Sequence, residues 1–216
     1  SCAMPCRWKY KIIEEKRPDE KYEIEETENG TYIFNSKDLC MIDHIPELIE
    51  SGVDSFKIEG RMKTALYAAV AARAYRRAID DYFESPECYR ENLPSYREEI
   101  GKCTYREYTT GFFFGKPNEE AQIYDSNTYV RNYTYLGTVA SVDGEGYAHF
   151  EQKNKFSVGD RIERMCFDGS NELLTVLEIR NPEGLSVESA PHPKEALAVR
   201  FDGSVAAGEL LRMETL

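Results

Sequence analysis

Hydrophobic and polar positions in the first third of the chain predict strands alternating with helices. Short apolar runs typical of strands occur at residues 31–34 and 53–58, and each is followed by a polar loop and then by helical spacing. The first helix is expected over residues 43–50 and is closed by Gly52, and the second runs from a Thr64 cap to about Tyr82. This β-α-β-α order is the repeating unit of parallel α/β folds.

The second of these helices has the clearest apolar face. Its members recur at helical spacing: Leu66, Tyr67, Val70, Ala71, Ala74, Tyr75, Ala78, Ile79 and Tyr82. Arg73, Arg76 and Arg77 fall on the opposite side, where we expect a solvated face. Two β-α units do not bury both faces of a parallel sheet, so part of the domain is expected to be missing upstream or to be supplied in trans.

The pattern changes after residue 83. Residues 83–127 contain Pro86, Pro94 and Pro117 and are expected to be irregular, with the aromatic stretch 105–115 packed into an interdomain seam. Short alternating strands with glycine-containing turns follow, at residues 133–142, 147–150, 161–167, 173–179, 185–187 and 196–201. Their spacing predicts a small closed β-barrel. The expected domains are a truncated α/β core at 1–84, a linker at 85–127 and a barrel at 128–216.

Composition and charge narrow the class of protein. Hydrophobic residues make up 41% and charged residues 31% of the 216 residues, and no apolar run approaches the length of a membrane span, so a soluble, cytoplasmic, globular protein is expected. The formal net charge of -12 argues against sequence-independent nucleic-acid binding, which depends on neutralising phosphates. The chain begins at Ser1 without an initiator Met, which suggests a cut inside a longer protein.

Three of the six cysteines are candidate metal ligands. Cys2 and Cys6 are close in sequence, and Cys40 follows the first predicted strand, in a loop of the functional face if the core is a βα-barrel. Soft thiolates select zinc, copper or an iron–sulfur cluster, and three unrelated thiols are the alternative. Cys88, Cys103 and Cys166 are expected to be ordinary packed thiols.

Charged and polar residues at the two strand ends form candidate substrate contacts. They are Asn35, Ser36, Lys37 and Asp38 after the first strand, and Lys57, Glu59, Arg61 and Lys63 at the end of the second. Such groups suit an anionic substrate, although a structural ion-pair network explains them equally well. The sequence has neither an H-E-x-x-H nor a G-x-S-x-G motif, so zinc or serine proteolysis has no direct support.

Four segments together resemble the collagenase-like U32 peptidase family. They are residues 2–10 (CAMPCRWKY), 35–40 (NSKDLC), 52–63 (GVDSFKIEGRMK) and 108–112 (YTTGF), and the C-terminal barrel is also similar to that family. The resemblance covers nearly the whole chain. It implies the end of a TIM-like βα-barrel followed by a small C-terminal β-barrel.

The resemblance also implies a function. Bacterial members similar to this chain act in tRNA modification, in a prephenate-linked hydroxylation of uridine at carbon 5 in the anticodon loop, with a [4Fe–4S] cluster. The family's cysteine set then corresponds to Cys2, Cys6 and Cys40, and its earliest cysteine would lie upstream of Ser1. We therefore expect tRNA and prephenate, or a similar carboxylate, as partners of an enzymatic parent protein. This fragment itself is expected to lack the cluster and to be inactive alone.

Two other functions stay open at this point. A collagenase-like protease rests on the family's name, and a non-catalytic module that binds RNA or a protein partner rests on the barrel. Zinc is the alternative to iron at the cysteines.

Overall fold

The computed structural model describes residues 25–27, 30–32, 37–61, 63–116 and 129–215. The chain divides into two compact units, the first made of Ser1–Met41 and Tyr105–Val130 and the second of Ile42–Thr104 and Arg131–Leu216. The second unit combines a few helices with a large antiparallel sheet, so the expected mixture of α/β and all-β structure is present. No helix among the described residues is long and apolar enough to cross a membrane.

The described residues of the first unit include two short strand pairs. Strands β1 (Glu25–Thr27) and β2 (Gly30–Tyr32) are antiparallel, whereas β3 (Asp38–Leu39) and β4 (Tyr108–Thr109) are parallel. The strand expected at residues 31–34 overlaps β2, and its second half lies outside the described residues.

The first predicted helix is confirmed, but the strand expected after it is wrong. A 3-10 turn η2 (Ile42–His44) leads into α1 (Ile45–Glu50), and Gly52 follows at a φ of +78°. Residues 53–58 pair with no strand in the described part of the chain, and Val53 and Ile58 are 48% and 42% exposed. An apolar run of strand type becomes a strand only beside a partner that completes its ladder. The expected TIM-like barrel remnant is therefore not confirmed.

Helix α2 (Ala65–Glu84) follows its sequence pattern closely. The Thr64 hydroxyl caps it by accepting the Tyr67 N–H at 3.3 Å. Five members of the predicted apolar face are buried: Leu66, Val70, Ala71, Ala74 and Ala78. Near the start of the helix, Leu66 and Val70 on this face pack against Met165, which lies in the C-terminal part of the second unit.

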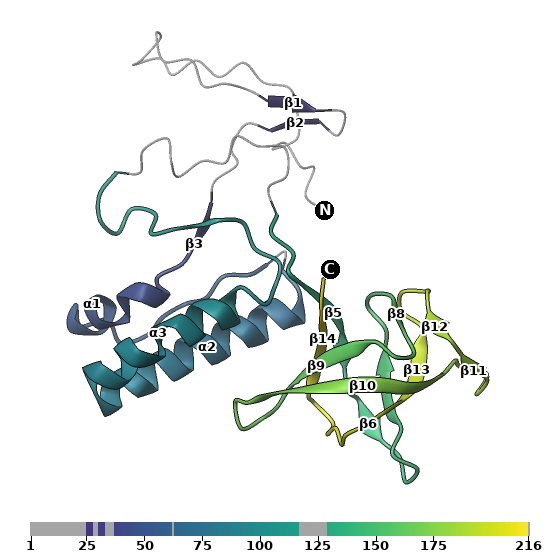
Figure 1. Ribbon diagram of the computed structural model, residues 1–216. Coiled ribbons are helices and arrows are strands. Elements are labelled where there is room, and N and C mark those ends of the chain that lie inside the picture. Colours follow the sequence, from purple (N-terminus) through teal and green to yellow (C-terminus); the bar gives the residue numbers. More distant parts are fainter. Residues whose placement is uncertain (1–24, 28–29, 33–36, 62, 117–128, 216) are drawn as a thin grey trace. The chain divides into compact units, whose positions relative to one another are not determined.

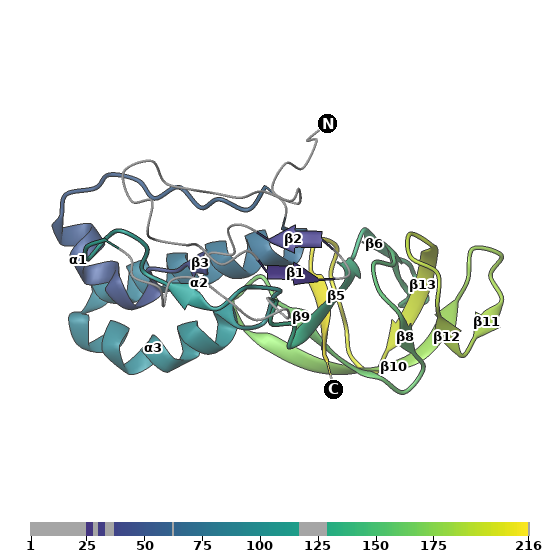
Figure 2. The ribbon, with the colours of Figure 1, turned by 90° about the horizontal axis from the view of Figure 1, so that it is seen from above.

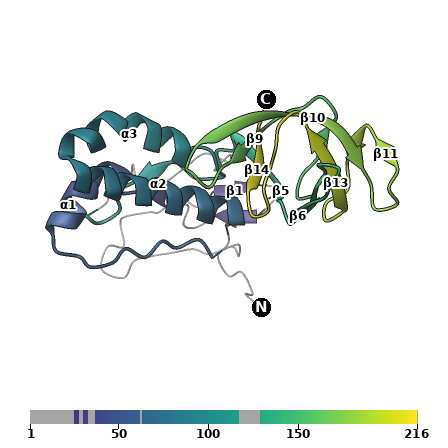
Figure 3. The ribbon, with the colours of Figure 1, turned by 90° about the horizontal axis from the view of Figure 1, so that it is seen from below.

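Helix α3 (Pro86–Ile100) occupies a region that was expected to be irregular, and that expectation is wrong there. Pro86 stands in the first helical turn, where its missing N–H costs nothing, and the Ser85 hydroxyl accepts the Cys88 N–H at 3.0 Å. Pro94 lies inside the helix, which survives because Tyr89 and Tyr96 bury their rings. Figures 1 and 3 both show α3 lying along α2.

The C-terminal part of the second unit is built from ten short strands. They are β5 (Tyr133–Thr138), β6 (Ser141–Val142), β7 (Ala148–Glu151), β8 (Phe156–Ser157), β9 (Arg161–Met165), β10 (Asn171–Arg180), β11 (Ser186–Val187), β12 (Ser189–Ala190), β13 (Ala196–Phe201) and β14 (Leu210–Glu214). The main sheet has the order β5-β14-β9-β10-β13-β7-β6 and is antiparallel throughout. Its curvature is visible in Figure 2.

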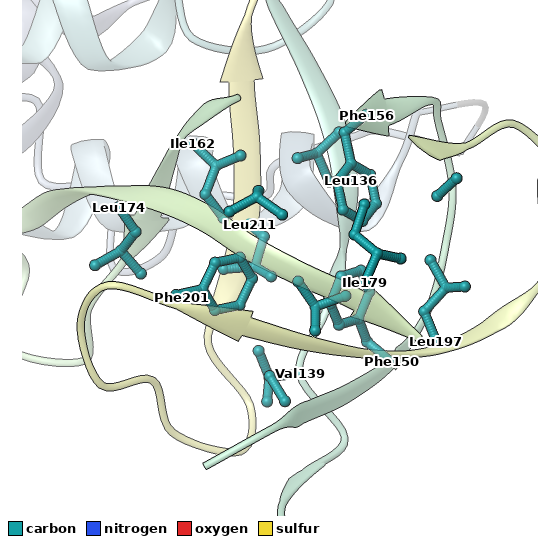
Figure 4. Close-up of a cluster of buried hydrophobic side chains, with 14 residues drawn as sticks. Leu136, Val139, Phe150, Phe156, Ile162, Leu174, Ile179, Leu197, Phe201 and Leu211 are labelled. Atoms are coloured by element: carbon teal, nitrogen blue, oxygen red, sulfur yellow. The ribbon is translucent and has the colours of Figure 1, made fainter. Parts of the chain in front are cut away.

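This sheet closes on itself through one bent segment, residues 133–142. Its first half, β5, pairs with β14, and its second half, β6, pairs with β7 at the opposite end of the strand order. The bend lies at residues 139–140. The expected small closed β-barrel is thus confirmed, although β8, β12 and β14 were not foreseen. Its apolar side chains, including Phe150, Ile179 and Leu211, meet inside the barrel (Figure 4).

Closure depends on a glycine at the point where β5 and β7 approach each other. A Cβ atom at Gly137 would lie 2.6 Å from Phe150 Cδ2 and 2.9 Å from the Glu151 carbonyl oxygen. We predict that Gly137→Ala lowers the free energy of unfolding by about 1–3 kcal/mol, because backbone and a core ring must move. The matched control is Gly144→Ala, where nothing lies within 4 Å of the added carbon. Urea unfolding that shows equal stability for the two variants would contradict this reading.

A cluster of buried charges joins the helices to the barrel. Arg212 on β14 is 0% exposed, and its two Nη atoms donate to the two carboxylate oxygens of Glu99 on α3, each at 3.0 Å. Its Nε donates to Glu163 on β9 at 2.7 Å. Arg73 contacts Glu99, and Lys102 donates to Glu163 at 3.2 Å. Arg73 was expected on a solvated face, and this contact corrects that expectation.

The same contacts set the charge state of Glu99. Burial raises the pKa of this carboxyl group, but the hydrogen bonds and positive charges of Arg212 and Arg73 outweigh burial and hold the pKa at about 2. A depressed pKa stabilises the folded state above the unfolded value of 4.5, and this stabilisation is lost as the pH falls towards 2.

Removing the Arg212 guanidinium should therefore lower the stability of the folded protein at neutral pH. We predict that Arg212→Met lowers the free energy of unfolding by about 3–5 kcal/mol at pH 7, since two carboxylates stay behind without their main partner. The difference from the unmodified protein should shrink as the pH falls from 4.5 to 2, because the Glu99 carboxylate becomes protonated and no longer depends on the guanidinium. Arg200→Met, which breaks a partly exposed pair with Glu178, is the control and should cost under about 1 kcal/mol. If the loss of unfolding free energy in Arg212→Met did not change with pH, it would contradict this role of Glu99.

Candidate functional site at the carboxyl ends of strands β3 and β4

The parallel pair β3–β4 brings two distant segments of the first unit to one edge. Asp38 N–H donates to the Glu107 carbonyl at 2.8 Å, and Cys40 N–H donates to the Thr109 carbonyl at 2.9 Å. Because parallel strands end on the same side, Cys40 and the turn that follows Thr109 lie at the same edge. This edge is the best-defined candidate site among the described residues of that unit.

An ion pair fixes the strands beneath this edge. One carboxylate oxygen of Asp38 accepts the backbone N–H of Arg106 at 3.0 Å, and the other accepts Arg106 Nε and Nη2 at 3.1 and 3.0 Å. Both side chains are mostly buried, whereas the neighbouring Lys37–Glu107 pair is more exposed on its carboxylate side. Asp38 therefore has a structural task, and a substrate contact by Lys37 or Asp38 stays a prediction.

Cys40 is one of the three predicted ligands and has intermediate burial. Cys2 and Cys6 lie outside the described residues, as does Asn35, so the proposed ligand set stays a prediction. Cys103 and Cys166 are buried in the second unit. Desolvation and the charges of Asp81 and Glu84 raise the pKa of Cys88, which disfavours its ligating thiolate form.

The second group of candidate substrate contacts belongs to the other unit. Lys57 and Glu59 form an exposed ion pair of 2.8 Å, and Arg61 is exposed. Lys63 lies 5.2 Å from the ring centre of Tyr67 and donates to the Thr104 carbonyl at 3.4 Å. Since residues 53–58 form no strand, these side chains do not share a strand end with Lys37 and Asp38 in the way the sequence predicted. Their binding role stays a prediction.

The sequence did not predict an exposed aromatic turn at residues 111–115 as a functional feature. Phe112, Phe113 and Phe114 are 78%, 56% and 60% exposed, so the expectation that they pack into a seam is wrong. Tyr105 and Tyr108, in contrast, stack on each other with ring centres 4.5 Å apart. The signal in the sequence was three consecutive phenylalanines between Gly111 and Gly115, a pattern that fits a turn better than a packed strand.

Comparison with known proteins identifies the family. Residues 1–123 match the model of peptidase family U32, and residues 131–212 match the peptidase family U32 C-terminal domain. The chain therefore belongs to the U32 peptidase family.

Its similar relatives include proteins named for two activities. "tRNA hydroxylation protein P1" of Bacillus subtilis is 31% identical over 212 residues, covering 98% of this chain and 50% of the relative. "tRNA hydroxylation protein P" of Escherichia coli is 36% identical over 183 residues, or 84% of this chain and 39% of the relative. "Collagenase" of Porphyromonas gingivalis is 29% identical over 165 residues, or 75% and 43%. The chain spans half or less of the length of these relatives.

The Asp38–Arg106 pair should control the order of the edge that carries Cys40. We predict that Asp38→Ala speeds amide hydrogen exchange at the β3–β4 bonds by about ten-fold or more, since a charge-assisted and partly buried contact is lost. Glu107→Ala removes only the Lys37 ion pair and should change exchange by less than about three-fold. The exchange rates of the two variants are compared by mass spectrometry on peptides containing Cys40 or Thr109. Equal exchange in the two variants would show that Asp38 does not fix this edge.

Proposed function

We propose that the protein acts in tRNA modification, in the hydroxylation of uridine at carbon 5 in the anticodon loop. Two supports lead to this proposal. Relatives that align with 98% and 84% of the chain are named tRNA hydroxylation proteins. The main structural support is the edge at the carboxyl ends of β3 and β4, where a hydrogen bond to the Thr109 carbonyl fixes the backbone of Cys40 beside an exposed aromatic turn. A thiol held in place next to groups that can contact a base suits chemistry on RNA.

The proposed cofactor is an iron–sulfur cluster held by Cys2, Cys6 and Cys40. Cys40 fits a ligand role, because its thiol is neither deeply buried nor far from the fixed end of a strand. Thiolates are the usual ligands of such clusters, and the same donors would also accept zinc. A bound cluster would supply redox chemistry or activate the substrate. The chain's own contribution is to fix the ligand position through the β3–β4 hydrogen bonds.

We further propose that prephenate, or a similar carboxylate, is held by cations near residue 61. Arg61 is exposed, and Lys63 lies close by in sequence. A guanidinium binds a carboxylate through two parallel hydrogen bonds, so Arg61 is the favoured contact. Lys57 is less suitable, because Glu59 already neutralises it at 2.8 Å.

A peptidase is the second candidate, and the collagenase relative is the observation that favours it. The two candidates differ in what the purified protein does to gelatin. Digestion that is abolished in Cys40→Ser would favour the peptidase, whereas no digestion agrees with action on RNA.

The proposed function is tested in cells that lack the gene. We predict that mass spectrometry of their tRNA shows loss of 5-hydroxyuridine derivatives, restored by the unmodified gene. Cys40→Ser should fail to restore them, because it removes one ligand, while the control Cys88→Ser should restore them fully. Unchanged 5-hydroxyuridine in the deletion strain would reject the proposal. Full restoration by Cys40→Ser would remove Cys40 from the chemistry.

A further inference from the structure

The turn at residues 111–115 exposes large aromatic rings to solvent. Phe112 is 78% exposed and Phe113 is 56% exposed. Both rings therefore leave much of their apolar area in water, where its burial by a ligand would be favourable. Contiguous exposed apolar surface of this kind marks an interaction site more often than a chance feature.

The backbone that carries these rings forms hydrogen-bonded turns. Phe113 N–H donates to the Thr110 carbonyl and Gly115 N–H to the Phe112 carbonyl, both at 3.3 Å, which gives two successive tight turns. Gly111 and Gly115 adopt φ angles of +58° and +132°, a region that favours glycine. A Cβ atom on Gly111 would also lie 3.2 Å from Leu39 Cδ1 on β3. The rings are therefore presented by a built turn, which lowers the entropy lost on binding.

The turn shares its edge with Cys40. It leaves the carboxyl end of β4, and Cys40 leaves the carboxyl end of the parallel strand β3. The Thr109 carbonyl that accepts the Cys40 N–H lies only three residues before Phe112. A flat group stacked on the turn would be held beside the proposed cysteine site.

Local charge is nearly balanced, so affinity at this turn depends on the ring faces. Lys37 is paired with Glu107 and Arg106 with Asp38, and Lys116 adds a single positive charge, while the whole chain has a net charge of -12. Such a weak positive balance gives little affinity for the backbone of a duplex, which requires many neutralised phosphates. Unpaired bases offer another source of affinity, because stacking on aromatic side chains contributes about 1–3 kcal/mol per base.

We propose that Phe112 and Phe113 stack on an unpaired base of the substrate RNA and hold it at the Cys40 edge. This inference rests on the proposed function and adds the chemistry of recognition: a single-stranded loop, read through its base faces. Stacking requires aromatic rings and not merely apolar surface, so an aliphatic replacement distinguishes it from docking on a lipid bilayer or in a protein groove.

The test compares aromatic with aliphatic replacements in the intact protein. Phe112→Leu/Phe113→Leu keeps the apolar character and removes the ring faces, whereas the control Phe112→Tyr/Phe113→Tyr keeps them. Binding of a fluorescent anticodon stem–loop RNA is measured by anisotropy at several salt concentrations, with thermal unfolding as the check on folding. We expect the leucine variant to bind roughly 5- to 150-fold more weakly and the tyrosine variant to bind within about three-fold of the unmodified protein.

Two further measurements make the outcome decisive. Placing an abasic nucleotide at each loop position in turn should abolish the difference between the variants at one position, where the stacked base is absent. Equal RNA binding by the leucine and tyrosine variants would overturn the inference, as would aromatic-independent binding to vesicles of phosphatidylcholine and phosphatidylglycerol.

Failure of this inference is distinct from failure of the proposed function. If the leucine variant restores 5-hydroxyuridine in the deletion strain as well as the unmodified gene does, the stacking proposal fails and the function stands. If the unmodified gene is not needed for 5-hydroxyuridine, the function fails whatever the binding data show.

Discussion

The Arg212 guanidinium group has no exposed surface, and it links the helices of the second unit to the barrel of the same unit. It makes a bidentate contact with Glu99, which lies on helix α3, and a further contact with Glu163, which lies on barrel strand β9. Isolated in a low-dielectric interior, any one of these charges would be strongly unfavourable, so each requires the others. The helices therefore keep one position on the barrel, with Leu66 and Met165 packed together beside the charges. The docking of the helices on the barrel within the second unit follows from this constraint.

Sequence patterns predicted those parts of the fold that depend on local rules. The apolar face of α2 and its Thr64 cap were foreseen because helical spacing and capping act within a few residues. The barrel strands were foreseen from alternation and turns, apart from β8, β12 and β14. In β14, Arg212 reads as an exposed position until its distant partners are known. Helix α3 was missed because Pro86 and Pro94 disfavour a helix on average, yet Pro86 occupies the first turn and buried tyrosines hold the rest.

The candidate site was predicted less fully, since its parts meet only through long-range pairing. The motif around Cys40 identified the family, but nothing near residue 38 in the sequence announces Arg106 as a partner or β4 as a neighbour. The strand expected at residues 53–58 shows the opposite error, because a β-type pattern does not specify whether a partner strand exists. Exposure of Phe112 and Phe113 could not be read from hydrophobicity, which predicts burial for both.

Cys40 is proposed to belong to a ligand set at the β3–β4 edge. Iron and acid-labile sulfide contents of the intact protein, purified without oxygen, give a direct test of this role. We expect both elements to be present in a fixed ratio to protein, Cys40→Ser to lose most of them, and Cys88→Ser to keep them. Absence of iron and sulfide from the unmodified protein, or equal contents in Cys40→Ser, would contradict it.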